Sequence, residues 1–188
     1  MSEQNKTAII KASMHLAAQQ GWGSITLTDI AREAQIDLAA LHDMFEDKSD
    51  ILVAFGRMID RTVLEGAEEM EEGNSPRDVL FDLIMDRFEA LNEYRAGVTA
   101  VLKSFKCDPK ESLICAPSLC RSMGWMLEAA GISTHGLPGM LKISGLSALY
   151  LKTARIWVTD ETADMSKTMA ELDKNLAHVE KWAVRFGF

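Results

Sequence analysis

The stretch that decides the fold begins at Thr26 and reads TLTDIAREAQIDLAALHDMFEDK. Thr26 stands three residues before Asp29, which is the spacing of a capping box, where a hydroxyl and an acid satisfy the free N–H groups at the start of a helix. Apolar residues then return every three or four positions, which predicts a short helix over Leu27–Ala34. A tight break at residues 35–37 and a second short helix over Leu38–Phe45 complete a helix-turn-helix.

Helices are expected on both sides of this motif. The segment Thr7–Gln20 places apolar residues on one face and stops at Gly21, a residue type that commonly ends helices. A long helix follows Lys48 and Ser49 and continues to the acidic residues 68–72. These signals predict a three-helix domain over residues 1–48, which we call the head.

The remaining residues, 49–188, predict a larger helical body. The chain has only four prolines and few alternating apolar runs, so we expect no sheet. The clearest linker is Gly73–Pro76, because glycine ends one helix and proline starts the next. The expected fold is therefore all-α, with about nine helices: a head with a helix-turn-helix and a helical-bundle body. The expected body helices after the linker are Arg77–Asn92, Tyr94–Lys106, an element opening at Asp108 and kinked or restarted at Pro117, Met123–Ala130, Gly139–Val158 and about Ala163–Phe186.

The composition is that of an ordinary folded protein. Of 188 residues, 47% are hydrophobic and 26% are charged, with a net charge of -8, and these values exclude wholesale disorder. No stretch approaches the roughly 18 apolar residues of a membrane-spanning helix, and residues 1–10 show no secretion signal. We therefore expect a cytoplasmic protein without a transmembrane segment.

The chain shows no motif of an enzyme or of a metal site. It has no Gly-rich phosphate loop, no zinc-protease motif and no serine-nucleophile motif. The three cysteines (Cys107, Cys115 and Cys120) have no partner at metal-ligand spacing, so we expect reduced thiols. We expect no catalytic residue, no metal and no cofactor.

Residue types and turn spacings agree with one known pattern across residues 7–52. The positions that carry the agreement are Ala12, Leu16, Gly21, Trp22, Thr26, Asp29, Ile30, Ala31, Ala34, Ile36, Leu41, Phe45, Lys48, Ile51 and Leu52. In this combination they resemble the N-terminal domain of the tetracycline-repressor (TetR) family of bacterial transcriptional regulators. The resemblance implies a homodimer that reads double-stranded DNA with the third helix of each head in the major groove.

The resemblance also implies which residues meet DNA. The expected base-facing residues are Leu38, Ala39, His42 and Asp43, and the expected backbone-facing residues are Thr26, Thr28 and Lys48. Departures from the family pattern include Gln35, where glycine is usual, and Asp37, which we expect to cap the third helix.

The charge of the head is unusual for a domain that binds DNA. Residues 1–52 contain four Lys and Arg against eight Asp and Glu, which gives a net charge of -4. Affinity for DNA depends on neutralising phosphates. We therefore expect binding that is weak, strongly salt-sensitive or dependent on dimerisation.

Apolar residues of the middle helices are candidates for an effector pocket, which the resemblance places in this region. The chain contains 11 methionines, whose flexible side chains suit a plastic apolar cavity for a small apolar ligand or lipid. The same spacing is typical of an ordinary core, and both interpretations stay open. The candidates are Phe81, Met85, Phe88, Leu102, Phe105, Trp125 and Met126.

The last two helices carry apolar stripes, and in the final helix these recur at alternating four- and three-residue steps. Such a seam is typical of helix pairs that pack together, and the resemblance implies a four-helix interface between two chains. Burial inside one chain is the alternative. The interface candidates are Met140, Ile143, Ser147, Tyr150, Leu172, Leu176, Val179 and Ala183.

A second family competes at the C-terminal end. Residues 150–157 and 160–173 also resemble lipid-binding coenzyme-Q biosynthesis proteins, which share the TetR fold, have lost DNA binding and use an amphipathic C-terminal helix on membranes. Trp182, Phe186 and Phe188 would be the residues that enter a membrane interface. Our main hypothesis is a TetR-type repressor modulated by a small apolar ligand. The alternatives are a lipid carrier that does not bind DNA and a former regulator kept as an interaction module.

Overall fold

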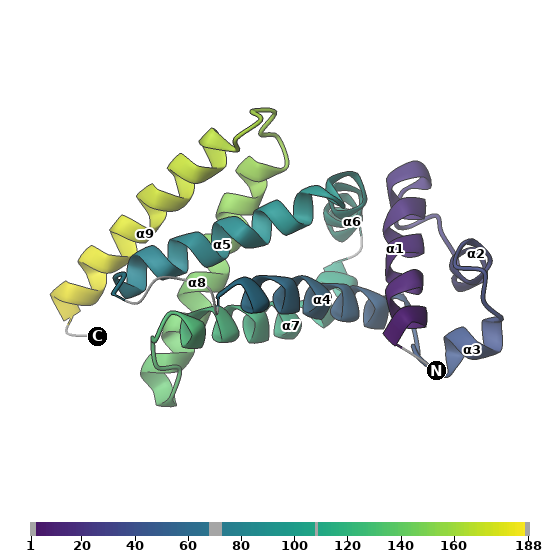
Figure 1. Ribbon diagram of the computed structural model, residues 1–188, viewed down its shortest axis with the longest axis horizontal. Helices are drawn as coiled ribbons and strands as arrows, with labels where there is room; N and C mark the ends of the chain where they lie inside the picture. Colours follow the sequence, from purple (N-terminus) through teal and green to yellow (C-terminus); the bar gives the residue numbers. More distant parts are fainter. Residues whose placement is uncertain (1–2, 68–72, 108, 187–188) are drawn as a thin grey trace. The chain divides into compact units, whose positions relative to one another are not determined.

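The computed structural model describes residues 3–67, 73–107 and 109–186, with side chains described at all of these except 107, 109 and 181–186. Over these ranges the chain forms nine α-helices and no β-strand (Figure 1), which confirms the all-α prediction. The helices are α1 (Glu3–Gln20), α2 (Leu27–Glu33), α3 (Leu38–His42), α4 (Lys48–Ala67), α5 (Pro76–Asn92), α6 (Arg95–Cys107), α7 (Pro109–Ala129), α8 (Gly136–Trp157) and α9 (Ser166–Phe186).

The chain forms two compact units. The first contains residues 1–58 and 91–118, and the second contains residues 59–90 and 119–188. Helices α4, α5 and α7 therefore each begin in one unit and end in the other. The first unit contains α6 and the start of α7 together with the helices of the head. The two units are therefore not consecutive segments of the sequence. A functional division after residue 48 stays a prediction.

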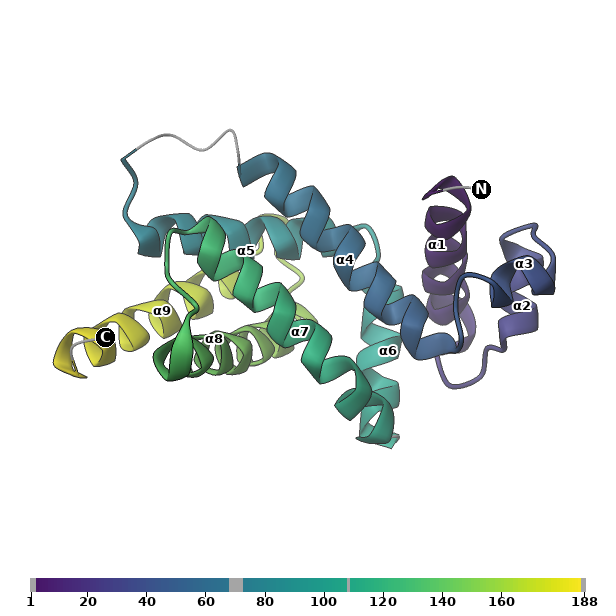
Figure 2. The same ribbon diagram turned by 90° about the horizontal axis from the view of Figure 1, so that it is seen from below.

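The head is built on α1. This helix packs against α2 and α6, and α2 packs against α3 (Figure 2). The contact with α6 is close at Gly97, where a Cβ atom would lie 2.5 Å from the carbonyl oxygen of Met14. Glycine is therefore required at this crossing. The chain leaves α1 through Gly21, whose φ of +83° confirms the expected helix stop.

The second unit has an aromatic core. Phe88 is fully buried and stacks on Tyr150 with 5.1 Å between ring centroids and on Trp157 with 5.8 Å. Helix α8 packs along α9, so that Leu172 of α9 is also fully buried. The aromatic stack joins α5 to α8, and the leucine side of α9 covers α8.

A buried carboxylate organises the connection from α8 to α9. Asp160 accepts hydrogen bonds from the backbone N–H and hydroxyl of Thr162 and from the same two groups of Thr168, which lies in the first turn of α9. Desolvation raises the pKa of the Asp160 carboxyl, but these hydrogen bonds outweigh it and hold that pKa well below its ordinary value. The charged form of Asp160 is thus part of the fold.

Several boundaries differ from those predicted, and three differences stand out. Helix α1 starts at Glu3, earlier than expected, and α3 ends at His42 rather than at Phe45. Helix α7 runs without interruption through Pro117, although a proline in a helix removes one hydrogen bond and usually kinks the chain. Pro117 is exposed, so water can satisfy the carbonyl that loses its partner.

Candidate functional site

The helix-turn-helix begins at the predicted capping box. The hydroxyl of Thr26 accepts from the backbone N–H of Asp29 at 3.2 Å, and the carboxylate of Asp29 accepts from the backbone N–H of Thr26 at 3.0 Å. The same carboxylate accepts from the Thr26 hydroxyl, and these bonds lower the pKa of Asp29. The capping box is therefore confirmed, and the hydroxyl of Thr26 is engaged in it.

The turn between α2 and α3 is closed by a Schellman motif. The N–H of Ile36 donates to the carbonyl of Ala31 at 3.0 Å, and the N–H of Gln35 donates to the carbonyl of Arg32 at 3.2 Å. Gln35 has a φ of +56°, in the left-handed region that favours glycine. A side chain in that region costs on the order of 1–2 kcal/mol. The motif therefore forms here at a cost that glycine would avoid.

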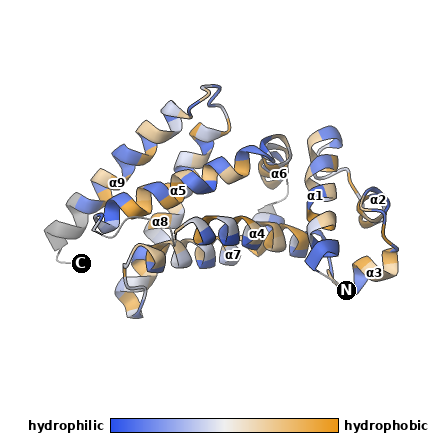
Figure 3. Cartoon of the chain, in the orientation of Figure 1, coloured by the Kyte–Doolittle hydropathy of each residue, from blue (hydrophilic) through white to orange (hydrophobic). Residues whose placement is uncertain are grey.

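The four predicted base-facing residues are exposed, three of them on α3 and Asp43 at its C-cap. Leu41 is buried and holds the short helix in the head, whereas Leu38 is 49% exposed. Figure 3 shows α3 coloured as hydrophobic over most of its length. Asp37 occupies the N-cap position but its side chain makes no cap hydrogen bond, so the prediction that it caps the helix is wrong. The exposed residues of the predicted set are Leu38, Ala39, His42 and Asp43.

Lys48 at the start of α4 is engaged inside the head. Its ammonium donates to the carbonyl of Trp22 at 2.9 Å and to that of Ile25 at 3.0 Å, and it lies 5.1 Å from the centroid of the Trp22 ring. A lysine ammonium has three donors, so one remains to meet a phosphate. Thr28, the other predicted backbone contact, is exposed on α2.

The acids around α3 fall into two groups. Asp47 accepts from the backbone N–H of Asp50 at 3.0 Å, and Asp50 accepts from that of Glu46 at 2.9 Å, so both carboxylates close the start of α4. Asp37 and Asp43 are exposed and have no side-chain hydrogen bond within the described part of the chain. Only the first group is explained by the fold.

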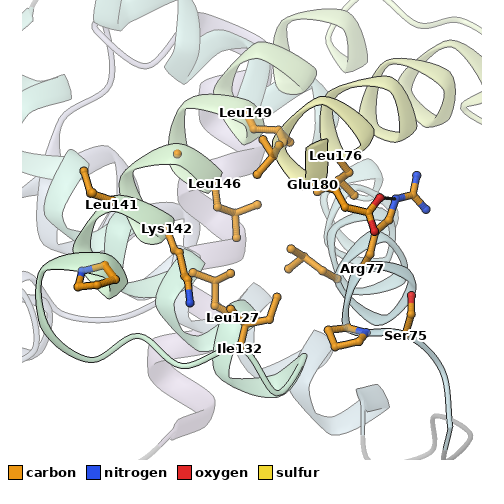
Figure 4. Close-up of a pocket in the computed structure, with 15 residues that line it drawn as sticks. Ser75, Arg77, Leu127, Ile132, Leu141, Lys142, Leu146, Leu149, Leu176 and Glu180 are labelled. Atoms are coloured by element: carbon orange, nitrogen blue, oxygen red, sulfur yellow. Dashed lines mark ion pairs between the residues drawn. The ribbon is translucent and has the colours of Figure 1, made fainter. Parts of the chain in front are cut away.

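A pocket of about 530 Å³ lies in the second unit (Figure 4). The start of α5, the end of α7, and helices α8 and α9 enclose it, and its volume lies in the usual range for small-ligand sites. Three charged side chains stand on its lining: Arg77, Lys142 and Glu180. Its apolar lining includes Leu80, Leu127, Ile132, Leu146, Leu149 and Leu176.

A buried polar cluster joins four helices of the second unit. Arg87 of α5, which is 5% exposed, pairs with Asp60 of α4 and donates from Nε to the hydroxyl of Tyr150 at 3.3 Å. Ser122 of α7 donates to the second oxygen of Asp60 at 2.6 Å. Burial opposes the charge of Arg87, but Tyr150 and Asp60 outweigh burial and keep its pKa above the ordinary value. The pair is compensated and fully hydrogen-bonded.

Comparison with known proteins identifies the head. Residues 9–55, which contain the whole helix-turn-helix, match the family model described as bacterial regulatory proteins, tetR family. The head is therefore similar to the DNA-binding domain of TetR-family regulators. No curated protein matches it.

Solved structures with the same fold include TetR-family regulators. A TetR transcriptional regulator from Nitrosomonas europaea is 23% identical, with a TM-score of 0.73 over 92% of this chain and 96% of that one. FadR of Thermus thermophilus, solved with lauroyl-CoA, is 20% identical, with a TM-score of 0.63 over 92% and 91%. NalD of Pseudomonas aeruginosa, a repressor of a multidrug efflux pump, is 18% identical, with a TM-score of 0.58 over 94% and 97%. The comparisons support a regulator and do not favour the lipid-carrier alternative.

The pocket in the second unit is not lined by the residues that the sequence suggested. Phe88 and Met126 are fully buried in the core, and Trp125 is 61% exposed. Leu102 and Phe105 lie on α6 in the first unit, and Phe81 and Met85 are half-buried on α5. None of these seven residues lines the pocket described above. The helical spacing of apolar residues shows that a side chain faces another helix. It does not show whether the packing between the two helices leaves a pocket.

The residues predicted for a dimer interface face in two directions. Within one chain Ser147, Tyr150, Leu172 and Leu176 are buried, and Ile143 is half-buried. Met140 is 63% exposed and Val179 is 49% exposed, and the side chain of Ala183 lies outside the described residues.

A different row of α8 is exposed, and it recurs at alternating four- and three-residue steps. It consists of Leu137, Leu141, Ser144, Ala148 and Leu151. These steps are typical of a helix that packs against a second helix. The stripe predicted for the interface on the same helix faces mostly inward.

Two absences hold for the described part of the chain. No helix in residues 3–67, 73–107 and 109–186 is long and apolar enough to cross a membrane. Over the same ranges, no group of three or more His, Cys, Asp or Glu side chains could hold a metal ion.

The thiol of Cys115 is half-buried. Burial, with smaller contributions from Glu111 and Asp47, raises its pKa to about 11, so it is protonated at neutral pH.

Proposed function

We propose that this TetR-family regulator binds double-stranded DNA as a homodimer and represses transcription until a small apolar ligand binds the body. The observation that carries the proposal is the exposed surface of α3, where Leu38, Ala39, His42 and Asp43 stand on the second helix of a helix-turn-helix. In such motifs this helix lies in the major groove. The regulator acts in the cytoplasm and has no enzymatic activity.

The exposed row of α8 supports the homodimer. Leu137, Leu141 and Leu151 are large apolar side chains open to solvent in the single chain, and burial of such side chains favours association. Small residues between them, Ser144 and Ala148, let a second helix come close. A two-fold dimer would separate the two α3 helices by about one turn of DNA, 34–36 Å.

The cations of the head limit its affinity for DNA. Arg32 pairs with Asp29 at 3.4 Å, Lys11 pairs with Glu93 at 3.9 Å, and Lys48 has one donor left. With three phosphate contacts per protomer, the logarithm of the affinity of a dimer falls with the logarithm of the salt concentration with a slope of about -5. Binding should therefore be strong only at low salt.

Fluorescence anisotropy with duplexes from the promoter region of the regulator's own gene tests this function. We expect sequence-selective binding at low salt that weakens steeply as salt is added. The change His42→Ala should reduce the preference for the bound sequence about fivefold or more, since one base contact contributes about 1–3 kcal/mol. The matched change His135→Ala, in the loop before α8, should leave it unchanged. Absence of selective binding even at the lowest salt would refute the proposal.

Ligand action requires different affinities of the ligand for two states of the dimer. The pocket in the second unit is the candidate site, since it is apolar and of suitable volume. A ligand that prefers the state unable to bind DNA would release the repressor. The test is whether ligand addition lowers DNA affinity in the anisotropy assay by the same factor as DNA lowers ligand affinity.

A further inference from the structure

Three charged side chains line the pocket of the second unit: Arg77, Lys142 and Glu180. Arg77 pairs with Glu180 at 3.6 Å, and it also pairs with Asp173 at 2.5 Å and with Asp78 at 3.1 Å. The charge of Arg77 is therefore compensated by carboxylates. Lys142 is the lining cation that has no such ion pair among the described residues.

Lys142 has no carboxylate partner within the described part of the chain. Its ammonium has one hydrogen bond there, to the carbonyl of Ser133 at a long 3.5 Å. Figure 4 shows its side chain beside Leu127 and Ile132, on the opposite side of the pocket from Arg77. A half-buried ammonium with one long hydrogen bond has donors free for an anion.

The walls between these charged groups are apolar. Leu80, Leu127, Leu146, Leu149 and Leu176 come from four different helices and line the pocket together. Leucine walls favour a ligand in proportion to the apolar area that it buries. They cannot satisfy a polar or charged group of a ligand, so such a group must lie at the lining charge.

We propose that this pocket binds a single-chain amphiphile with an anionic head group, with the alkyl chain among the leucines and the anion at Lys142. This ligand class rests on the proposed function in one respect: the same pocket is the proposed effector site. A cationic amphiphile would meet an uncompensated ammonium of like charge. A neutral amphiphile would gain the apolar contacts but not the charge-assisted hydrogen bond.

Isothermal titration calorimetry of the full chain tests the ligand class with three probes of equal length: dodecanoate, 1-dodecanol and dodecylammonium, each below its micelle concentration. We expect dodecanoate to bind at least tenfold more tightly than dodecanol, because hydrogen bonds to charged groups contribute about 1.5–3 kcal/mol. Dodecylammonium should bind more weakly than either. Between octanoate and dodecanoate each added methylene should raise affinity about fourfold.

The variant Lys142→Gln tests the site. It should lower dodecanoate affinity about tenfold and change dodecanol affinity less than twofold. The matched variant Lys167→Gln, on an exposed residue of α9 that does not line the pocket, should change neither. Equal dodecanoate binding by the wild type and Lys142→Gln, or tighter binding of dodecylammonium, would overturn the proposal. So would binding to phosphatidylglycerol vesicles without binding to monomeric dodecanoate.

The experiments distinguish a wrong effector role of the pocket from a wrong ligand class. If dodecanoate binds in a Lys142-dependent way but leaves DNA affinity unchanged, the proposed function is wrong on ligand control and the ligand class stands. If DNA is released by another compound while dodecanoate does not bind, the ligand class is wrong and the proposed function stands.

Discussion

The change Arg87→Met tests the buried pair at the centre of the second unit. It removes a guanidinium that is paired with Asp60 and hydrogen-bonded to Tyr150. Methionine fills similar space without a charge. Of its hydrogen bonds described above, the carboxylate of Asp60, which is 8% exposed, then keeps the one from Ser122.

The expected loss follows from the burial of both partners. Breaking a buried pair by removing one partner costs about 3–5 kcal/mol, because a buried charge is left uncompensated. For a protein of this length each kcal/mol corresponds to about 2–4 °C in Tm, so Tm should fall by about 6–20 °C. In the double variant Asp60→Asn/Arg87→Met no charge is buried, so its free energy of unfolding should lie within about 1–2 kcal/mol of the wild type.

Urea unfolding followed by circular dichroism measures these free energies, at one protein concentration because a dimer makes stability concentration-dependent. The matched control is Arg61→Met, which removes an exposed arginine paired with Glu65 at 2.8 Å and should cost less than about 0.5 kcal/mol. A double variant as unstable as Arg87→Met would refute the reasoning, because the loss would then come from packing around position 87 and not from the orphaned charge.

Three further changes test single features. Gln35→Gly should stabilise the protein by about 0.5–1 kcal/mol in urea unfolding, because relief of the left-handed conformation outweighs the added backbone entropy, whereas Gln20→Gly at the end of α1 should destabilise it. Asp160→Asn should lower the free energy of unfolding most at pH 7, and this loss relative to the wild type should shrink below about pH 4. The reason is that a carboxylate with a lowered folded-state pKa stabilises the fold above the ordinary carboxyl pKa, and this stabilisation is lost as pH falls. A loss that stays constant down to pH 3 would contradict this. Asp43→Asn should tighten non-specific DNA binding in anisotropy assays at low salt and leave Tm unchanged. Glu161→Gln, on the other unit, should leave DNA binding unchanged.

The head could be predicted because its signals are local. The capping box at Thr26 and the helix stop at Gly21 each need only a few neighbouring residues, and both are confirmed. The errors arise where the outcome depends on side-chain geometry. Asp37 has the right residue type for an N-cap, but its carboxylate does not turn toward the backbone. Pro117 breaks helices on average, yet on an exposed face it is tolerated in α7.

The pocket and the buried pair could not be predicted in the same way. Asp60 and Arg87 lie on different helices, and no local spacing links them. A signal existed, since each charge interrupts an otherwise apolar helix face, such as the one formed by Phe55, Ile59 and Val63 on α4. Such a charge in a core must find a partner, but the sequence does not say which residue it is.

The negative charge of the head separates into a structural and a functional part. Asp47 and Asp50 hold the start of α4 with hydrogen bonds to the backbone, so their side chains stabilise the fold. Asp43 stands on the exposed surface of α3 without a side-chain hydrogen bond among the described residues, so its charge affects only what approaches that helix. It repels every phosphate, and among base edges in the major groove it can accept only from an amino group such as that of cytosine. An acid at this position therefore weakens binding to all DNA sequences, and it weakens binding least where a cytosine faces it. The selectivity for such sequences increases as the overall affinity for DNA falls.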